Sequence, residues 1–279
     1  MQGRIIKQIS NQYTVRCDDE IKECSALGKF RNDKITPMVG DYVIIDDRNN
    51  QIIKILPRKN ELKRPVIANV DRALIITSAK EPKLSFLLLD KMLSLVIHNS
   101  IKPLICITKI DLLTRKELRD LKKIKRYYHK IGIKVFFNNK TNKLKRELKN
   151  KTVVLVGQSG AGKSTLLNKL DKTLNLKTSP ISKSLGRGIH TTRHTELFQV
   201  GDILVADTPG FSSLSFENIS EEELSKTFLE FKKCKCKFKN CLHINENDCE
   251  VKKLVEKNKI LPSRYTSYLK IIKEIGDNK

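Results

Sequence analysis

Hydrophobic and polar positions change their pattern after residue 56. Up to that point the chain consists of short β-type runs bounded by Asn, Asp, Gly and Pro, which is typical of strands joined by turns. Five strands are therefore expected, at Gly3–Ile9, Gln12–Cys17, Ile21–Leu27, Asp41–Asp46 and Gln51–Leu56. Five short strands in so few residues favour a small closed or nearly closed barrel of oligonucleotide-binding (OB) or SH3-like type.

A polar segment with a proline at each end, Pro57–Pro65, is predicted to be a linker. After it, helical patterns at Leu84–His98 and Arg115–Lys130 are separated by continuous apolar runs. These runs predict strands at Ala73–Thr77, Leu104–Thr108, Ile133–Phe137, Thr152–Val156 and Ile203–Ala206. Strands without polar alternation, separated by helices, indicate a parallel sheet covered on both faces.

The last part of the chain, from Ser220 onward, has a strongly charged helical pattern that a cluster of cysteines interrupts. The sequence thus predicts three parts. A barrel domain is expected over residues 1–60, an α/β domain over residues 66–215 and a helical region over residues 216–279.

Charge adds a prediction about partners. The 279 residues include 55 Lys and Arg against 31 Asp and Glu, which gives a formal net charge of +24. This excess favours a polyanionic partner, because neutralising phosphates releases counterions. We expect nucleic acid or a ribonucleoprotein, although biased codon usage also enriches lysine. Charge alone does not separate RNA from DNA or from an anionic membrane surface.

Three classes of protein are excluded as working hypotheses: membrane-spanning, secreted and disulfide-built. The most apolar stretch, Phe86–Ile97, is interrupted by Asp90 and Lys91. Met1–Val15 contains no continuous apolar block of secretory type, so we expect no export. Seven cysteines are too few for a disulfide scaffold in a chain of this length, and four of them lie within Cys234–Cys249. That clustering favours metal binding in a reducing cytosol.

A phosphate-binding loop is predicted directly after the strand Thr152–Val156. The spacing G-x-x-x-x-G-K-[ST] is met by Gly157, Gln158, Ser159, Gly160, Ala161, Gly162, Lys163 and Ser164. Glycines let successive backbone N–H groups point inward at phosphate oxygens, and the helix that follows adds its positive dipole end. Lys163 would reach the β- and γ-phosphates, and Ser164 would offer its hydroxyl to Mg²⁺. Thr165 completes the predicted nucleotide-binding segment.

A base-recognition element is predicted at the end of the strand Leu104–Thr108. Its residues are Thr108, Lys109, Ile110 and Asp111, which resemble the N/T-K-x-D motif of GTPases. The Asp111 carboxylate would accept bonds from guanine N1–H and N2–H₂, whereas adenine would leave that carboxylate desolvated and unpaired. Thr108 stands where asparagine is more common. The next base-contacting element is degenerate, with Asn138 or Asn139 as candidates.

Two further segments match the switches of GTPases. Asp207-Thr208-Pro209-Gly210 fits D-x-x-G, in which Asp207 would hold Mg²⁺ and the Gly210 N–H would bond the γ-phosphate. The loop 186–193 lies between this segment and the phosphate loop, and it contains the threonine expected to complete the Mg²⁺ shell, Thr192 or, second, Thr191. Phe211 follows Gly210 where Ras-like enzymes have a water-orienting glutamine. His190 is the internal candidate to replace that glutamine.

The cysteine cluster predicts a closed metal site. Cys236, Cys241, His243 and Cys249 give the spacing C-x₄-C-x-H-x₅-C. Three thiolates and one imidazole form a tetrahedral Zn²⁺ set with no open position for a catalytic water, so the predicted role is structural. Cys234 is a competing ligand, because C-x-C places two sulfurs close together.

The order of the motifs is the last informative feature. TKID at 108 precedes the phosphate loop at 157, the threonine loop at 191 and DTPG at 207, whereas ordinary GTPases begin with the phosphate loop. The chain resembles the ribosome small-subunit-dependent GTPase A (RsgA-type) family over essentially its whole length. This resemblance rests on the small barrel, the linker followed by Asn69-Val70-Asp71, the permuted order, GRGIHTTR, DTPGF and the cysteine cluster.

The resemblance implies a circularly permuted P-loop GTPase domain between an N-terminal OB-like barrel and a C-terminal helical zinc-binding domain. It also implies a cytoplasmic GTPase that acts late in maturation of the small ribosomal subunit, binds rRNA and is stimulated by that subunit. Cys236 fits the family spacing better than Cys234. Mg²⁺ with GTP, one structural Zn²⁺ and a monomeric state complete the expectation.

Two other functions stay open at this point. An RNA-binding assembly chaperone whose nucleotide site only regulates affinity is compatible with Phe211. A basic GTPase on anionic membranes is disfavoured, because the sequence has no evident amphipathic anchor or lipidation site.

Overall fold

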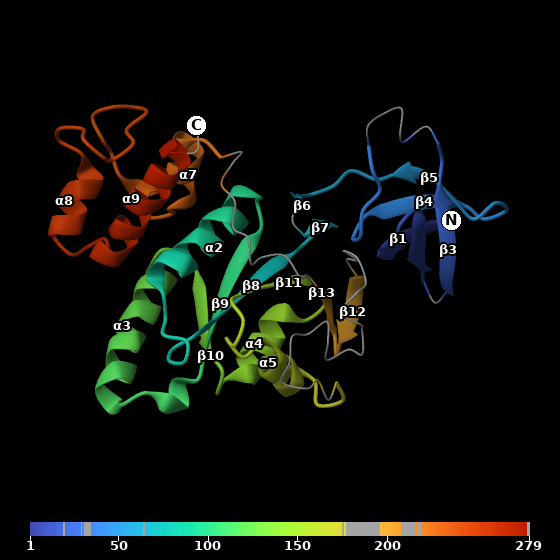
Figure 1. Ribbon diagram of the computed structural model, residues 1–279, viewed down its shortest axis with the longest axis horizontal. Helices are drawn as coiled ribbons and strands as arrows, with labels where there is room; N and C mark the ends of the chain where they lie inside the picture. The colour runs from blue at the N-terminus through green and yellow to red at the C-terminus, as the bar shows by residue number, and fades with distance from the viewer. Residues whose placement is uncertain are drawn as a thin grey trace.

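The computed structural model describes the chain except for residues 19, 29, 31–34, 64, 175, 177–195, 208–215, 217, 218, 278 and 279. Three parts are visible in Figure 1: a β-barrel at one end, a central sheet flanked by helices, and a C-terminal group of helices that lies against α2 (Phe86–His98). This architecture confirms the fold class that the sequence predicts.

Five strands close the N-terminal barrel: β1 (Gln2–Ile9), β2 (Gln12–Cys17), β3 (Glu20–Ala26), β4 (Tyr42–Asp46) and β5 (Gln51–Ile55). Their order is β1-β2-β3-β5-β4, and β4 pairs back with β1. Apolar side chains that alternate along the strands fill the interior, among them the fully buried Ile5, Val15 and Ile52. The predicted barrel is confirmed, because the closing pair leaves no free edge between β1 and β4.

The predicted linker differs from expectation in that it holds a small hairpin, β6 (Glu61–Lys63) with β7 (Val66–Ala68). Its polar residues find partners in the protein instead of in water. Arg58 donates to both carboxylate oxygens of the buried Asp41 at 2.7 and 2.8 Å, and to Glu61 at 2.7 Å. The segment is therefore fixed to the barrel by a bidentate ion pair.

The central sheet contains five parallel strands in the order β10-β9-β8-β11-β13. They are β8 (Arg72–Ser78), β9 (Lys102–Thr108), β10 (Lys134–Phe137), β11 (Thr152–Val156) and β13 (Ile203–Asp207). An antiparallel strand, β12 (Glu196–Val200), lies next to β13 in the sheet. One residue pair, Lys7 with Glu196, continues the sheet from β12 into the barrel. The sequence analysis missed β12, which has polar residues at Glu196 and Gln199 and no continuous apolar run.

Helices cover both faces of this sheet, as predicted. The helices α2 and α3 (Arg115–Lys130) pack on one face, and α4 (Thr141–Leu148) and α5 (Lys163–Leu170) on the other. Alternate residues of β8 show the division: Ile75 belongs to the core under α2 and α3, while Leu74 and Ile76 belong to the core under α4 and α5. Side chains of a strand point alternately to opposite faces, so a strand buried on both faces must be apolar throughout.

The C-terminal region contains α7 (Glu221–Thr227), a short 3₁₀ turn η2 (Phe231–Lys233), α8 (Glu250–Glu256) and α9 (Pro262–Asp277). Its core includes Phe228, Phe231, Tyr268 and Ile271, and Leu87 and Leu95 of α2 pack against that core. Among the helices of the described residues, none is both long and apolar enough to cross a membrane.

A buried ionic cluster joins this region to the central domain. Arg264 on α9 is 1% exposed and donates to Asp90 on α2 at 2.5 Å and to both oxygens of Glu230 at 2.8 and 3.0 Å. Burial alone would raise the pKa of Glu230, but the charge and hydrogen bonds of Arg264 outweigh burial and hold that pKa below its ordinary value. The hydroxyls of Tyr128 and Tyr127 on α3 donate to Asp90 and Glu230 at 3.2 and 3.1 Å. Three helices and the η2 segment therefore meet at one guanidinium.

Replacement of Arg264 by methionine is expected to destabilise the protein by about 3–5 kcal/mol, because it leaves two buried carboxylates without their cation. Urea unfolding followed by circular dichroism measures the change. The matched control is K123A, which removes only the exposed pair with Asp120 and should cost less than about 1 kcal/mol. A loss for R264M no larger than that of K123A would show that the cluster does not hold the two parts together.

Candidate functional site

The site lies at one edge of the central sheet, where its parallel strands reach their carboxyl ends. β8 stands between β9 and β11, with Ser78 opposite Thr108 on one side and Ile75 opposite Val156 on the other. Loops that leave these strands must therefore start side by side. Crevices at this edge of an open α/β sheet are where such folds bind ligands.

Close packing shapes the phosphate loop that follows β11. Gly157 has φ of 152°, and a Cβ atom there would lie 2.2 Å from the Ile76 carbonyl oxygen, so this position admits only glycine. Gly162 has φ of 84° and immediately precedes α5. Lys163, the first residue of α5, curls back over the loop and donates from Nζ to the carbonyl oxygens of Gly157 and Gln158 at 2.7 and 2.8 Å. Burial lowers the pKa of Lys163.

Thr108 connects the base-recognition element to this loop. Its hydroxyl lies 2.7 Å from the carbonyl oxygen of Ala161 and 3.3 Å from that of Thr77. The Thr108 side chain also lies 3.5 Å from where a Cβ of Gly162 would be. Threonine thus forms a direct bond between the two motifs at the position where asparagine is more common in the N/T-K-x-D motif.

The rest of the TKID segment turns away from the sheet beside the same loop. Lys109 adopts a left-handed conformation, with φ of 53°, and the 3₁₀ turn η1 (Ile110–Leu112) follows it. Lys109 Nζ donates to the carbonyl oxygen of Glu81, and the next residue, Pro82, lies 3.8 Å from the Cβ position of Gly160. The Asp111 side chain is exposed. The two motifs therefore share one edge of the sheet despite their inverted order along the chain.

The β8–α2 loop at Glu81 and Pro82 is a part of this site that the sequence analysis missed. It contacts both Lys109 and the phosphate loop. Its position after the first buried strand of the parallel sheet was the available signal, because every loop at this edge is a candidate wall of the site.

The other predicted nucleotide-site residues are only partly visible. Asp207 ends β13, which is parallel to β11, so its backbone lies at the same edge as the phosphate loop. Ser164 is buried in the first turn of α5, and Thr165 beside it is exposed. Gly210, Phe211, Thr191, Thr192 and His190 lie outside the described residues.

Asn138 directly follows β10. Its backbone N–H donates to the Ile107 carbonyl oxygen at 3.1 Å, which aligns it with the start of TKID. Its side-chain oxygen is buried and has no hydrogen-bond partner within the described part of the chain. Asn139 is exposed.

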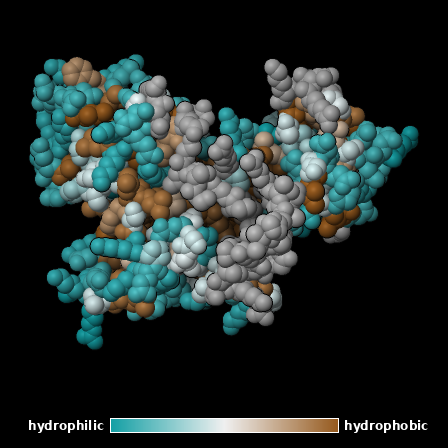
Figure 2. All heavy atoms as spheres, viewed as in Figure 1, coloured by the Kyte–Doolittle hydropathy of each residue, from teal (hydrophilic) through white to brown (hydrophobic). Residues whose placement is uncertain are grey.

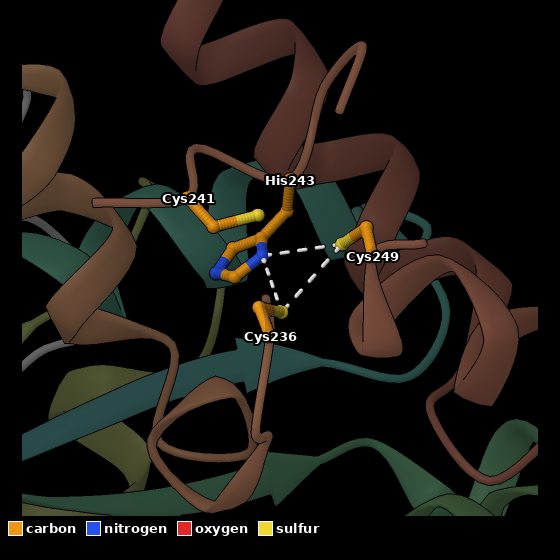
Figure 3. Close-up of side chains that lie close together, drawn as sticks. All are labelled: Cys236, Cys241, His243 and Cys249. Atoms are coloured by element: carbon orange, nitrogen blue, oxygen red, sulfur yellow. Dashed lines mark hydrogen bonds between the residues drawn. The ribbon is translucent and has the colours of Figure 1, made fainter. Parts of the chain in front are cut away.

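The four predicted metal ligands lie together in the C-terminal region (Figure 3). One atom from each of Cys236, Cys241, His243 and Cys249 falls within 4.8 Å of all the others. His243 Nδ1 is 3.3 Å from the Cys249 sulfur and 3.6 Å from the Cys236 sulfur, and those two sulfurs are 3.9 Å apart. Zn–S bonds of about 2.3 Å and Zn–N bonds of about 2.0 Å in a tetrahedron require sulfurs roughly 3.8 Å apart and nitrogen–sulfur distances of roughly 3.6 Å. The donor set fits a metal ion of this size.

Protonation of the ligands would be coupled to metal binding at this site. Burial raises the pKa of Cys241 to about 12 and also raises that of Cys249. These thiols would stay protonated in the absence of a positive charge, whereas a divalent ion displaces their protons. Burial lowers the pKa of His243, which leaves its imidazole neutral and able to ligate.

Cys234 lies apart from this set. Its thiol points at the Glu230 carbonyl oxygen, 3.6 Å away, and it is not one of the four converging residues. Contacts that position the ligand loop were not predicted: Tyr265 donates to the His243 carbonyl oxygen at 2.7 Å, and Glu246 accepts from the N–H groups of Leu242 and Ile244 at 2.5 and 2.8 Å. Such partners hold the loop that carries the metal-binding side chains in place.

Comparison with known proteins places these features in one family. The family model described as RsgA GTPase matches residues 47–217, and the RsgA N-terminal domain model matches residues 2–53. A protein of Oceanobacillus iheyensis named small ribosomal subunit biogenesis GTPase RsgA 2 is 48% identical over 288 residues, covering 100% of this chain and 98% of that protein. A Bacillus velezensis protein named small ribosomal subunit biogenesis GTPase RsgA is 45% identical over 291 residues, with the same coverage of 100% and 98%.

Solved structures agree. The crystal structure of YloQ, described as a circularly permuted GTPase, superposes with a TM-score of 0.83 at 38% identity, covering 100% of this chain and 96% of that one. YjeQ from Thermotoga maritima gives a TM-score of 0.82 at 32% identity, covering 98% of both chains. The resemblance drawn from the motif order is confirmed: the chain belongs to the RsgA GTPase family and is a GTP hydrolase with a circularly permuted GTPase domain.

Proposed function

We propose that this GTPase binds the small ribosomal subunit through its rRNA, assists the late maturation of that subunit, and hydrolyses GTP to GDP and phosphate when the subunit stimulates it. The names of the relatives support the ribosomal role, and the net charge of +24 suits an RNA partner. The bond between Thr108 and Ala161 carries the nucleotide assignment, because it fixes the base-recognition element against the phosphate loop.

The proposed GTP site extends from one motif to the other. Backbone N–H groups of residues 158–165 and the ammonium of Lys163 would bind the phosphates. The stem of Lys109 would lie against the base, while Asp111 would accept the two guanine donors. Thr108 acts as a positioning residue, since its hydroxyl contacts two backbone carbonyl oxygens of the protein, those of Thr77 and Ala161.

Hydrolysis requires three further parts, to which the two switch segments contribute. Mg²⁺, bound by Ser164, Thr192 and Asp207, would neutralise the charge that develops on the phosphates. The Gly210 N–H is proposed to bond the γ-phosphate. His190 is proposed to orient the attacking water in place of the glutamine that Phe211 replaces.

For the C-terminal region we propose one structural Zn²⁺ on Cys236, Cys241, His243 and Cys249. Thiolate-rich tetrahedral sets favour zinc over magnesium or calcium. A cytoplasmic location, in which the thiols stay reduced, and a monomeric state complete the proposal. The proposed functional units are the barrel of residues 1–60, the GTPase domain of residues 66–215 and the zinc-binding region of residues 216–279.

Replacement of Asp111 by alanine should weaken GTP binding at least tenfold while leaving ATP binding unchanged. Removing the carboxylate deletes two charged hydrogen bonds to guanine, each contributing about 1.5–3 kcal/mol. Equilibrium titration with a fluorescent GTP analogue and competition by ATP measure both affinities. The control D120A removes an exposed aspartate from α3 and should leave GTP affinity unchanged; equal effects of the two variants would place guanine recognition elsewhere.

Purified protein should contain one zinc ion per chain, which C249S loses and C234S keeps. Loss of a thiolate opens the tetrahedral set, and the short segment around it has few apolar side chains to hold it otherwise. Elemental analysis measures the metal, and limited proteolysis should show faster cleavage within residues 216–279 of C249S. The ligand assignment fails if C234S is the variant that loses zinc.

The subunit-dependent turnover assay tests the function itself. Purified small subunits should increase GTP turnover by the wild-type chain, and H190A should lower the stimulated rate by about a hundredfold, the range of general acid–base contributions, with GTP affinity unchanged. H98A, a histidine at the end of α2, is the control. Stimulated turnover that survives in H190A removes His190 from the mechanism. No stimulation of the wild type would instead favour an RNA-binding chaperone with incidental turnover.

A further inference from the structure

A basic pocket lies beside the nucleotide site, between α3 and the end of β10. Its volume is about 580 Å³, within the range of roughly 300–1,000 Å³ that ligand pockets occupy. The residues that line it are Ile110, Leu118, Lys122, Lys125, Arg126, His129, Phe137, Asn139 and Lys140. Four of these are lysine or arginine, and none of the described lining residues is acidic.

The spacing of the α3 residues makes them one stripe of the helix. Positions 118, 122, 125, 126 and 129 follow one another at intervals that return to the same face, as neighbours three and four apart do. Lys122 and Arg126 are exposed, one turn apart. The two acidic residues of α3 are engaged elsewhere: Glu117 caps the helix through Thr114, and Asp120 pairs with Lys123 at 2.9 Å. The cations of the stripe thus face the pocket without acids among them.

Opposite the stripe, the pocket wall adds an aromatic ring and more positive charge. Lys125 Nζ lies 4.6 Å from the centre of the Phe137 ring. Burial lowers the pKa of Lys125, and the charges of Lys140 and Lys143 lower it further. Within the described residues, none of Lys122, Lys125, Arg126 and Lys140 has an ion-pair partner. The ammonium groups of Lys125, Lys140 and Lys143 repel one another, so an anion here would relieve that repulsion.

We propose that this pocket binds the phosphate backbone of small-subunit rRNA. The inference rests on the proposed function, which supplies the polyanion, and it adds the surface that receives it. Lys122 and Arg126 would each contact a phosphate, with Lys125 and Lys140 behind them. Ile110 lines the pocket and is also the third residue of TKID. RNA bound at this face therefore lies next to the base-recognition element.

The hydropathy of the surface agrees with a polar partner. Hydrophilic side chains cover much of the molecule around α3 in the view of Figure 2. A phosphate backbone also tolerates the apolar residues Leu118 and Phe137 in the pocket lining, because its sugars can contact apolar surface. An acidic protein segment is the alternative partner, and the test below separates the two.

The test compares two charge reversals on the same helix. K122E/R126E removes the exposed pocket cations, and K116E/K123E makes the same change in charge on another face of α3. Full-length protein with a non-hydrolysable GTP analogue is titrated onto purified small subunits and onto deproteinised small-subunit rRNA at several salt concentrations. We expect K122E/R126E to raise both dissociation constants about tenfold and to reduce the slope of log affinity against log salt by about 1.5–2, since two phosphate contacts are lost. K116E/K123E should change either constant less than threefold.

Each other outcome overturns the inference in a distinct way. Equal weakening by both variants shows general attraction to RNA without a site, and no weakening by either shows that the pocket does not face rRNA. Weaker binding to subunits with unchanged binding to deproteinised rRNA assigns the pocket to an acidic protein partner. If the wild-type chain binds neither probe, the proposed function falls as well. GTP affinity, measured alongside, should be the same in all variants, since neither pair belongs to the nucleotide site.

Discussion

The close approach of the phosphate loop to β8 and β9 is the contact on which the nucleotide site depends. Gly157 passes so near the Ile76 carbonyl that no side chain fits, and Thr108 bonds the next turn of the loop at Ala161. The bond from Thr108 to Ala161 joins residues 53 positions apart in the chain. These contacts rely only on neighbouring parallel strands, which explains why a GTPase site survives inversion of its motif order. The sheet supplies the geometry whichever strand comes first.

Permutation has a second consequence, at the C-terminal region. The chain leaves the D-x-x-G segment and enters this region directly. The same region also packs back on α2 and α3 around Arg264. α2 follows the loop that touches Lys109, and α3 follows TKID itself. The C-terminal region is thus connected to the edge of the sheet covalently through the D-x-x-G segment and by packing through two helices. A change at that edge has two routes to whatever the C-terminal region contacts.

Sequence reasoning located the elements that depend on local patterns. The parallel strands have continuous apolar runs, and the barrel strands alternate, so both could be predicted, as could the phosphate loop, TKID and the metal-ligand spacing. The missed elements lack such signals. β12 is partly polar, the β6–β7 hairpin has three residues in each strand, and α4 lies in a stretch rich in lysine and asparagine. Arg264 could not be matched to Asp90, because 174 residues separate them and only the fold brings them together.

Acidic residues take part in two kinds of contact, ion or hydrogen-bond pairs and helix caps. Many carboxylates are engaged in internal contacts: Asp41 with Arg58, Asp71 with the Thr152 N–H, Glu147 with Lys134, and Glu230 with Arg264. Others cap helices, as Glu117 and Glu223 do. Asp41 and Glu230 are buried, whereas the capping residues Glu117 and Glu223 are exposed, and the formal net charge of the chain is +24. An ion pair uses one cation for each anion, so pairing leaves the excess of cations unchanged, and on α3 the fold gathers lysine and arginine along one stripe beside the nucleotide edge. A polyanion that meets this surface would contact the GTPase domain close to the TKID segment.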